Sequence, residues 1–176
     1  DPAFTDKLGG TVEADEVYIG GKVHGKKQGY KGNKTAVVAL VERGGRARSM
    51  VIERVTGKNL RDVLNAHVEP SAKLMTDDLP AYQKPGQAFA SHETVNHTAK
   101  EYVRGEVHTN TVEGFFSILK RGIDGIYHHI EYVPQYLAEF DFRYSNRKVS
   151  DGERTRLGLT KMSGKRLMLR QAAKSA

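Results

Sequence analysis

Two apolar, β-branched runs joined by a pair of glycines constrain the fold of this chain most strongly. The runs KTAVVALVE and RARSMVIERV meet at Gly44 and Gly45, and paired glycines supply the positive φ angles that a tight hairpin turn needs. A third run, TVEADEVYI, precedes them and stops at Gly20. The three runs predict an antiparallel meander of three strands at the start of the domain.

Helical and strand patterns alternate after the meander. Residues 57–68 repeat apolar side chains at helical spacing, and AKLMTDD then forms a short strand before a turn into another helix at Pro80. A fifth strand is expected around residues 88–94. The fold class predicted by this order is α/β, with a five-stranded mixed sheet, its first three strands antiparallel, flanked by helices.

The last part of the chain is predicted to be helical. HTNTVEGFFSILKRGI carries an apolar stripe at i, i+3, i+4 and i+7, and residues 131–144 predict a second, aromatic helix. The tail from Gly158 is basic and predicts a helix or an extended arm.

The opening DPAFT resembles residues left by an expression vector. We therefore expect vector-derived and leader residues over 1–9, one folded domain over 10–148, and a basic C-terminal tail over 149–176.

Composition limits the classes of function. The 176 residues include no cysteine, which excludes disulfides and thiolate zinc ligands within the chain. No apolar run is long enough to span a bilayer and no segment is typical of a signal peptide, so we expect a cytoplasmic protein without a membrane partner. The formal charge of +7 favours nucleic acid as the partner.

Three acids lie where metal-dependent phosphodiester chemistry would need them. Asp15 falls within the first strand, Asp77 at the end of the fourth, and Glu113 on the following helix, with 35 residues between the last two. Two-metal cleavage needs oxygen ligands contributed by several chain elements. The spacing is similar to the D,D(35)E signature of transposases and retroviral integrases.

Each acid has an alternative interpretation. Glu16 could replace Asp15 as a ligand, and Asp78 could replace Asp77, because either aspartate could cap the next helix. Glu113 follows Asn110 by three residues, which matches a capping box that would only stabilise the helix start. Asn110 could also be the third ligand instead.

Basic residues near these acids are candidates for DNA contacts. Lys120 lies seven residues after Glu113 on the same helix face, and Arg121 follows it, although both could simply be solvated cations at a helix end. A glycine-rich stretch after the first strand suits a segment that settles on a phosphate backbone. Its candidate lysines are Lys22, Lys26, Lys27, Lys31 and Lys34.

Several separated segments resemble one family. VEADEVYIGGK, LMTDDLPAY, HTNTVEGFFSILKRGI, YHHIEYVPQYLAEFDFRYSNR and GKRLMLR occur in the order seen in bacterial insertion-sequence DDE transposases that carry a zinc ribbon ahead of an RNase H-like catalytic domain. The resemblance implies an RNase H-like catalytic domain over 10–148. It also implies that Asp15, Asp77 and Glu113 bind two Mg²⁺ or Mn²⁺ ions and that Lys120 matches the lysine following the catalytic acid.

The resemblance implies a DNA-cutting and DNA-joining activity. Hydrolysis at a transposon end would free a 3′-hydroxyl, which would then attack target DNA, on a homodimer or larger assembly. End recognition and the zinc ribbon are expected to belong to a region ahead of this chain. Two other functions stay open: an RNase H-like nuclease or resolvase that does not join DNA, and a domesticated DNA-binding domain without catalysis.

Overall fold

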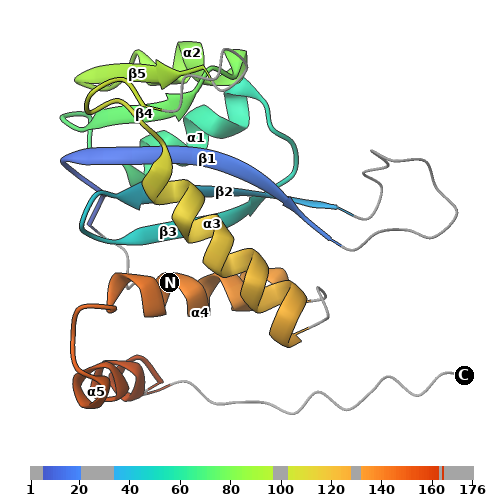
Figure 1. The fold of residues 1–176 in the computed structure, drawn as a ribbon, viewed down its shortest axis with the longest axis vertical. Helices are drawn as coiled ribbons and strands as arrows, with labels where there is room; N and C mark the ends of the chain where they lie inside the picture. Colours follow the sequence, from blue (N-terminus) through green and yellow to red (C-terminus); the bar gives the residue numbers. More distant parts are fainter. Residues whose placement is uncertain (1–5, 21–33, 97–102, 128–131, 163, 165–176) are drawn as a thin grey trace, which may run out of the picture. The chain divides into compact units, whose positions relative to one another are not determined.

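The structure is a computed structural model that describes residues 6–20, 34–96, 103–127, 132–162 and 164. The chain divides into two compact units, residues 1–145 and residues 146–176. The described part of the first unit contains a sheet with helices packed on it (Figure 1). The described part of the second contains the helix α5.

The sheet has five strands in the order β3-β2-β1-β4-β5. β1 pairs antiparallel with β2, and β2 pairs antiparallel with β3, whereas β1, β4 and β5 run parallel to one another. This mixed α/β arrangement is RNase H-like, as the sequence predicted. The strands are β1 (Thr11–Ile19), β2 (Thr35–Glu42), β3 (Ala47–Ile52), β4 (Lys73–Asp77) and β5 (Ser91–Val95).

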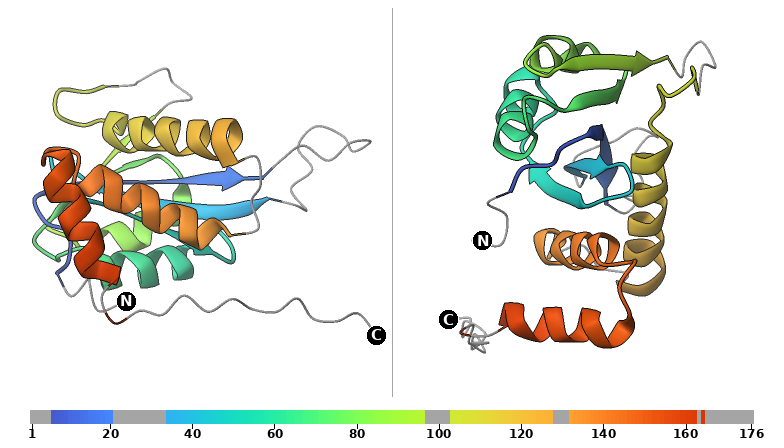
Figure 2. Two further views of the ribbon diagram at one scale, coloured as in Figure 1. Left: turned by 90° about the horizontal axis from the view of Figure 1, so that it is seen from below. Right: turned by 90° about the vertical axis from the view of Figure 1, so that its left-hand side faces the viewer.

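Helices cover the sheet with two separate hydrophobic cores. One core joins the sheet to α1 (Gly57–His67) and α2 (Pro80–Gly86). The other joins it to α3 (Asn110–Gly122) and α4 (Val133–Ser145). Figure 1 shows α3 crossing the sheet in front of β1 and β2, and Figure 2 shows it from two further sides. A short π-helix, η3 (Ile123–Tyr127), continues directly from α3.

The amphipathic pattern of α3 explains its position on the sheet. Val112, Phe115, Phe116 and Leu119 are all buried in the second core. Each large apolar side chain contributes about 1.5–3 kcal/mol when it is removed from water. Burial of this stripe fixes which side of α3 faces the sheet, and it leaves Glu113 and Lys120 exposed.

The turn between β2 and β3 uses its two glycines differently. Gly44 adopts a positive φ of 71°, which favours glycine. A Cβ atom on Gly45 would collide with the Glu42 carboxylate. The expectation that both glycines supply positive φ angles is therefore met by Gly44, while Gly45 leaves space for a neighbouring side chain.

Three expected boundaries differ from the structure. β5 begins at Ser91 rather than near residue 88, and α4 begins at Val133 rather than at residue 131. The C-terminal helix α5 spans Asp151–Met162 and so starts seven residues before Gly158. It starts there because Ser150 Oγ accepts a hydrogen bond from the Glu153 N–H at 3.3 Å, which satisfies a free amide of the first turn. None of the helices in the described ranges has the length and apolar character to cross a membrane.

Candidate active site

Three carboxylates meet where β1 passes the end of β4. Asp15 and Glu16 are consecutive residues of β1, and Asp77 is the last residue of β4. One carboxylate oxygen of each lies within 4.8 Å of an oxygen of the other two. In the part of the chain that the structure describes, this is the one group of three or more acids or histidines close enough to share a metal ion.

The strand pairing explains how neighbouring residues of β1 reach one site. β1 and β4 pair only as far as Glu13 and Met75, although β4 continues to Asp77 and stays paired with β5 there. Alternation along a strand sends Asp15 and Glu16 to opposite faces of the sheet. Because the strands are no longer paired at this point, both side chains can approach the end of β4.

Burial and charge repulsion dominate the electrostatics of this cluster. Burial, reinforced by the negative charges of Glu16, Asp77 and Glu113, raises the pKa of Asp15 from 3.8 to about 7. The Glu16 N–H acts in the opposite direction, because it donates to Asp15 Oδ1 at 2.7 Å and favours the ionised form. Burial and the charge of Asp77 also raise the pKa of Glu16, against a 3.0 Å hydrogen bond from the Tyr82 hydroxyl.

These properties fit a divalent metal ion. Carboxylate oxygens are the ligands that Mg²⁺ and Mn²⁺ prefer, and the ions bridge acids that repel one another without a cation. Asp15, Glu16 and Asp77 could act as such ligands from their present positions. Asp78 is exposed and lies outside the cluster, while Asp77 Oδ1 also accepts the Leu79 N–H at 3.1 Å in the turn into α2.

Glu113 approaches the cluster from α3. Its charge raises the pKa of Asp15, although it is not one of the three acids whose oxygens lie within 4.8 Å of each other. Its Oε1 accepts a hydrogen bond from Thr109 Oγ1 at 2.8 Å.

The N-cap residue of α3 is Thr109, and Asn110 is the first helical residue. The alternative in which Asn110 caps the helix and forms a capping box with Glu113 is therefore not what the structure shows.

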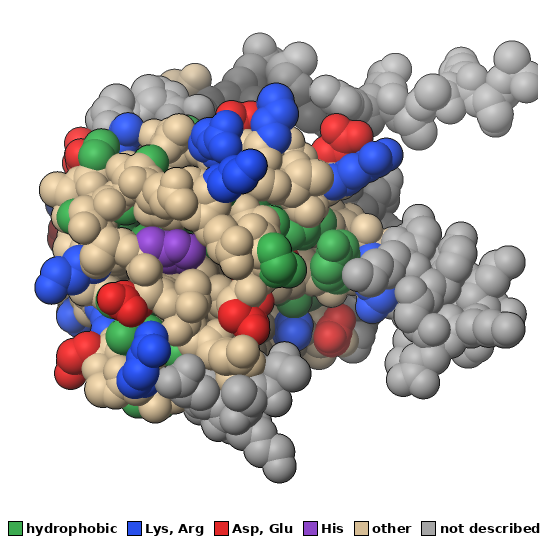
Figure 3. Space-filling view, turned by 90° about the horizontal axis from the view of Figure 1, so that it is seen from above, with side chains coloured by type: hydrophobic (Ala, Val, Ile, Leu, Met, Phe, Trp, Pro, Cys, Tyr) green, Lys and Arg blue, Asp and Glu red, His purple; other side chains and the backbone are tan. Residues whose placement is uncertain are grey.

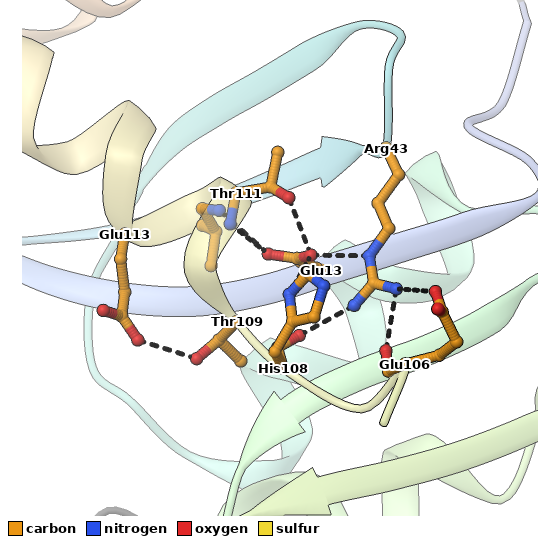
Figure 4. Close-up of polar contacts among 8 residues, drawn as sticks. Glu13, Arg43, Glu106, His108, Thr109, Thr111 and Glu113 are labelled. Atoms are coloured by element: carbon orange, nitrogen blue, oxygen red, sulfur yellow. Dashed lines mark hydrogen bonds and ion pairs between the residues drawn. The ribbon is translucent and has the colours of Figure 1, made fainter. Parts of the chain in front are cut away.

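A second buried carboxylate, Glu13, lies two residues before Asp15. Its side chain is completely buried and accepts hydrogen bonds from Arg43, Thr111 and Val112 (Figure 4). It therefore connects β1 and the β2–β3 turn to the start of α3. Glu13 was not among the predicted site residues, although an acid on the same face of a buried strand as Asp15 was a usable signal.

The candidate DNA-contacting residues are only partly within the described ranges. Asn110, Lys120 and Arg121 are exposed on α3, and Lys34 is half-buried just before β2. On the face above α2 and β5, basic side chains are interspersed with acidic ones (Figure 3). The remaining candidates lie outside the described residues, and they are Lys22, Lys26, Lys27 and Lys31.

Tyr82 is a further residue that sequence analysis missed. Among the described residues it has the largest fully buried side chain, and its hydroxyl contacts Glu16 from α2. Burial, followed by the charges of Glu16 and Asp15, raises its pKa well above 10, so it stays a hydrogen-bond donor. The contact between Tyr82 and the acids could not be predicted from the sequence, because an aromatic residue in a helix is typical of any hydrophobic core.

This chain is similar to parts of two larger known proteins. A curated relative, an uncharacterized protein in transposable element ISH50 of Halobacterium salinarum, is 29% identical over 131 residues, covering 65% of this chain and 45% of the relative. A chain in the cryo-EM structure of the simian T-cell lymphotropic virus intasome in complex with PP2A regulatory subunit B56 gamma gives a TM-score of 0.44 at 16% identity, over 93% of this chain and 51% of that one. The chain thus spans about half the length of these proteins.

A family model gives the more extensive match. The model of the ISXO2-like transposase domain matches residues 7–145, which include the whole sheet and α1 to α4. The matched range also includes Asp15, Asp77 and Glu113. Because this match covers most of the chain, the chain belongs to the family of ISXO2-like transposase domains.

Proposed function

We propose that this domain is the catalytic part of a DDE transposase that uses divalent metal ions to cut DNA at transposon ends and to join the freed 3′-hydroxyl to target DNA. The observation that supports this most directly is the cluster of Asp15 and Asp77 at the end of β4, with the charge of Glu113 close to Asp15. These three acids come from β1, β4 and α3. Together they would give a transposase domain the oxygen ligands that phosphodiester chemistry needs.

Each residue has a specific role in this proposal. Asp15, Asp77 and Glu113 would hold two Mg²⁺ or Mn²⁺ ions, which would supply activation of the attacking oxygen and stabilisation of the leaving one. Glu113 is exposed on α3 and would turn toward the other two when metal binds. Lys120 is exposed two turns further along α3 and binds a DNA phosphate.

Glu16 and Asn110 are the alternatives for the third ligand. Glu16 already lies within the cluster, but the Tyr82 hydroxyl occupies its Oε2. Asn110 is exposed at the start of α3. We favour Glu113 because it faces Asp15 closely enough to raise its pKa. Glu16→Gln and Asn110→Ala, assayed beside Glu113→Gln, distinguish the three.

The experiment that tests the function is cleavage of labelled transposon-end DNA in Mg²⁺ or Mn²⁺. Asp15→Asn, Asp77→Asn and Glu113→Gln should each abolish cleavage and leave DNA affinity largely intact, since each removes a charge that binds metal and repels phosphate. Asp78→Asn is the matched control, because this neighbouring acid is exposed and outside the cluster. Full activity of any of the first three variants removes that residue from the site.

Two other functions make different predictions in the same system. An RNase H-like nuclease or resolvase cleaves but does not join pre-cleaved transposon ends to a target plasmid. A domesticated DNA-binding domain binds DNA equally well with chelator and after Asp15→Asn, and it cleaves nothing. Formation of joined products by the wild-type protein, lost with chelator, supports transposition over both.

DNA is the partner in this proposal, both as transposon ends and as target. Lys22, Lys26, Lys27, Lys31 and Lys34 would contact the DNA backbone ahead of β2, and Asn110 and Arg121 would contact it at the two ends of α3. The complete protein would act in the bacterial cytoplasm, at the nucleoid, as a dimer or larger assembly on paired ends. Analytical ultracentrifugation of the protein with and without end DNA measures that assembly.

A further inference from the structure

Glu13 makes an unusually complete set of contacts for a carboxylate with no exposed surface. Its Oε2 accepts the backbone N–H groups of Thr111 and Val112 at 2.7 and 3.0 Å. Its Oε1 accepts Thr111 Oγ1 at 2.8 Å and Arg43 Nε at 2.7 Å. Every one of these partners is a donor, so the site is built for an ionised carboxylate.

These contacts replace the usual cap of a helix. The first amides of a helix lack partners within the helix, and an N-cap side chain normally accepts from the second or third of them. In α3 the N-cap residue is Thr109, whose side chain forms no such cap. Glu13 supplies the cap instead, from a strand 98 residues earlier in the chain. The negative charge also lies favourably at the positive end of the helix dipole.

Arg43 extends this contact to the segment that leads into α3. While its Nε binds Glu13, its Nη1 donates to the carbonyl of Glu106 at 2.8 Å and its Nη2 to that of His108 at 3.0 Å. Nδ1 of His108 also lies 3.2 Å from Glu13 Oε1, without the geometry of a hydrogen bond. The chain is thus held on both sides of the helix start (Figure 4).

The contacts lie next to two proposed metal ligands. Asp15 is two residues after Glu13 on the same side of β1, and Glu113 directly follows Val112 on α3. The Glu113 N–H also donates to the Thr109 carbonyl at 3.0 Å, within the helix turn that Glu13 caps. A shift of this turn relative to β1 therefore changes the separation of the Asp15 and Glu113 carboxylates.

We propose that Glu13 is a positioning residue for the metal site, which fixes α3 against β1 so that Glu113 faces Asp15. This role rests on the proposed function, in which Asp15 and Glu113 share metal. We call Glu13 with Arg43, Thr111 and Val112 the Glu13 latch. The latch does not contact metal or DNA itself. It acts through the position of Glu113.

Glutamine cannot replace Glu13 in this site. An amide nitrogen in place of Oε2 would face the Thr111 and Val112 N–H groups, and in place of Oε1 it would face the Arg43 Nε–H. Either orientation sets donor against donor. Glu13→Gln therefore keeps the size of the side chain and breaks the latch. Thr111→Ala is a milder variant, because it removes one hydroxyl contact and keeps both backbone amides.

Asp141 offers a matched control at another contact between a helix and the sheet. It is also buried, on α4, and its two oxygens accept the N–H and Oγ–H of Ser49 at 2.7 Å each. Asparagine can satisfy both groups, since the serine hydroxyl can turn to accept from the amide. Asp141→Asn thus makes the same change of carboxylate to amide at a contact with β3, which β2 separates from β1.

The test measures Mn²⁺ binding by isothermal titration calorimetry and amide hydrogen exchange on the full 176-residue chain. Glu13→Gln should weaken Mn²⁺ binding by about 10-fold or more, the usual effect of disturbing residues that orient metal ligands. Exchange should accelerate at Thr111 and Val112. Thr111→Ala should produce a smaller shift in the same direction, and Asp141→Asn should leave both measurements as in the wild-type protein.

The outcomes separate the latch from the proposed function. Wild-type Mn²⁺ binding that is lost in Asp15→Asn but unchanged in folded Glu13→Gln overturns the latch and leaves the function standing. Equal weakening by Glu13→Gln and Asp141→Asn also overturns it, because the effect would then be general loss of stability. If Glu13→Gln does not fold, Thr111→Ala decides by the same criterion. Absence of Mn²⁺ binding by the wild-type protein overturns the function and the latch together.

Discussion

Replacing Asp15 with asparagine should stabilise the protein in the absence of metal, and the gain should increase with pH. Burial and the surrounding acids raise the pKa of Asp15 from 3.8 to about 7. Between these values the folded protein binds more protons than the unfolded chain, so the free energy of unfolding falls as pH rises. Above about pH 7 the ionised carboxylate weakens the fold by its full amount.

The size of the effect follows from the pKa. At about 1.4 kcal/mol per pH unit, the difference between 3.8 and about 7 sets an upper limit of about 4 kcal/mol. Asp15 is partly accessible to solvent, which screens its charge, so we expect about 2 kcal/mol. That corresponds to a rise in Tm of about 4–8 °C for a chain of this length. Asparagine can still accept the Glu16 N–H that Asp15 Oδ1 accepts.

The assay is thermal unfolding of wild-type protein and Asp15→Asn in chelator at pH 5 and pH 8. More than half of the gain should appear between these two values, because Asp15 ionises in the folded state over this interval. Added Mn²⁺ should raise the Tm of the wild-type protein and not that of the variant. Asp78→Asn, at an exposed acid outside the cluster, should leave the Tm nearly unchanged. A variant that is equally or less stable at both pH values refutes the electrostatic reasoning.

Two further changes test other parts of the molecule. Asp141→Ala should lower the free energy of unfolding by about 1 kcal/mol, because it leaves the half-buried N–H and hydroxyl of Ser49 without their acceptor; chemical denaturation measures this, and an unchanged midpoint contradicts it. Lys120→Ala should weaken binding to all DNA sequences similarly and reduce the slope of log affinity against log salt concentration by about 1, as expected for one lost phosphate contact. A fluorescence anisotropy titration at several salt concentrations would show this, and an unchanged slope would exclude Lys120 from the DNA interface.

The main elements of the fold could be predicted because local patterns and tertiary packing agree. The apolar stripe of α3 and the strand runs around Gly44 each contain enough periodic residues to determine the type of element. Boundaries were less predictable where one polar contact decides them. The start of α5 depends on Ser150, which accepts the Glu153 N–H. In the sequence, this single capping residue is less conspicuous than the basic residues that follow Gly158, so the helix start was placed too late.

The candidate site was predictable in part for the same reason. Strand order brings Asp15 and the end of β4 together, so the position of Asp77 followed from topology. The sequence offered Glu16 only in place of Asp15. That Glu16 lies beside Asp15 and Asp77 did not follow from topology, because it depends on β1 and β4 separating after Glu13. The cap of α3 by Glu13 was also hidden, since a contact across 98 residues leaves no local pattern near either partner.

The central claim is that acids from β1, β4 and α3 bind divalent metal together. A crystal of the protein soaked in Mn²⁺ tests this directly through anomalous scattering. We predict a peak about 2.0–2.3 Å from carboxylate oxygens of Asp15 and Asp77, with Glu113 turned toward it. Well-diffracting crystals that show no peak there, or manganese bound only to acids elsewhere on the surface, would contradict the assignment.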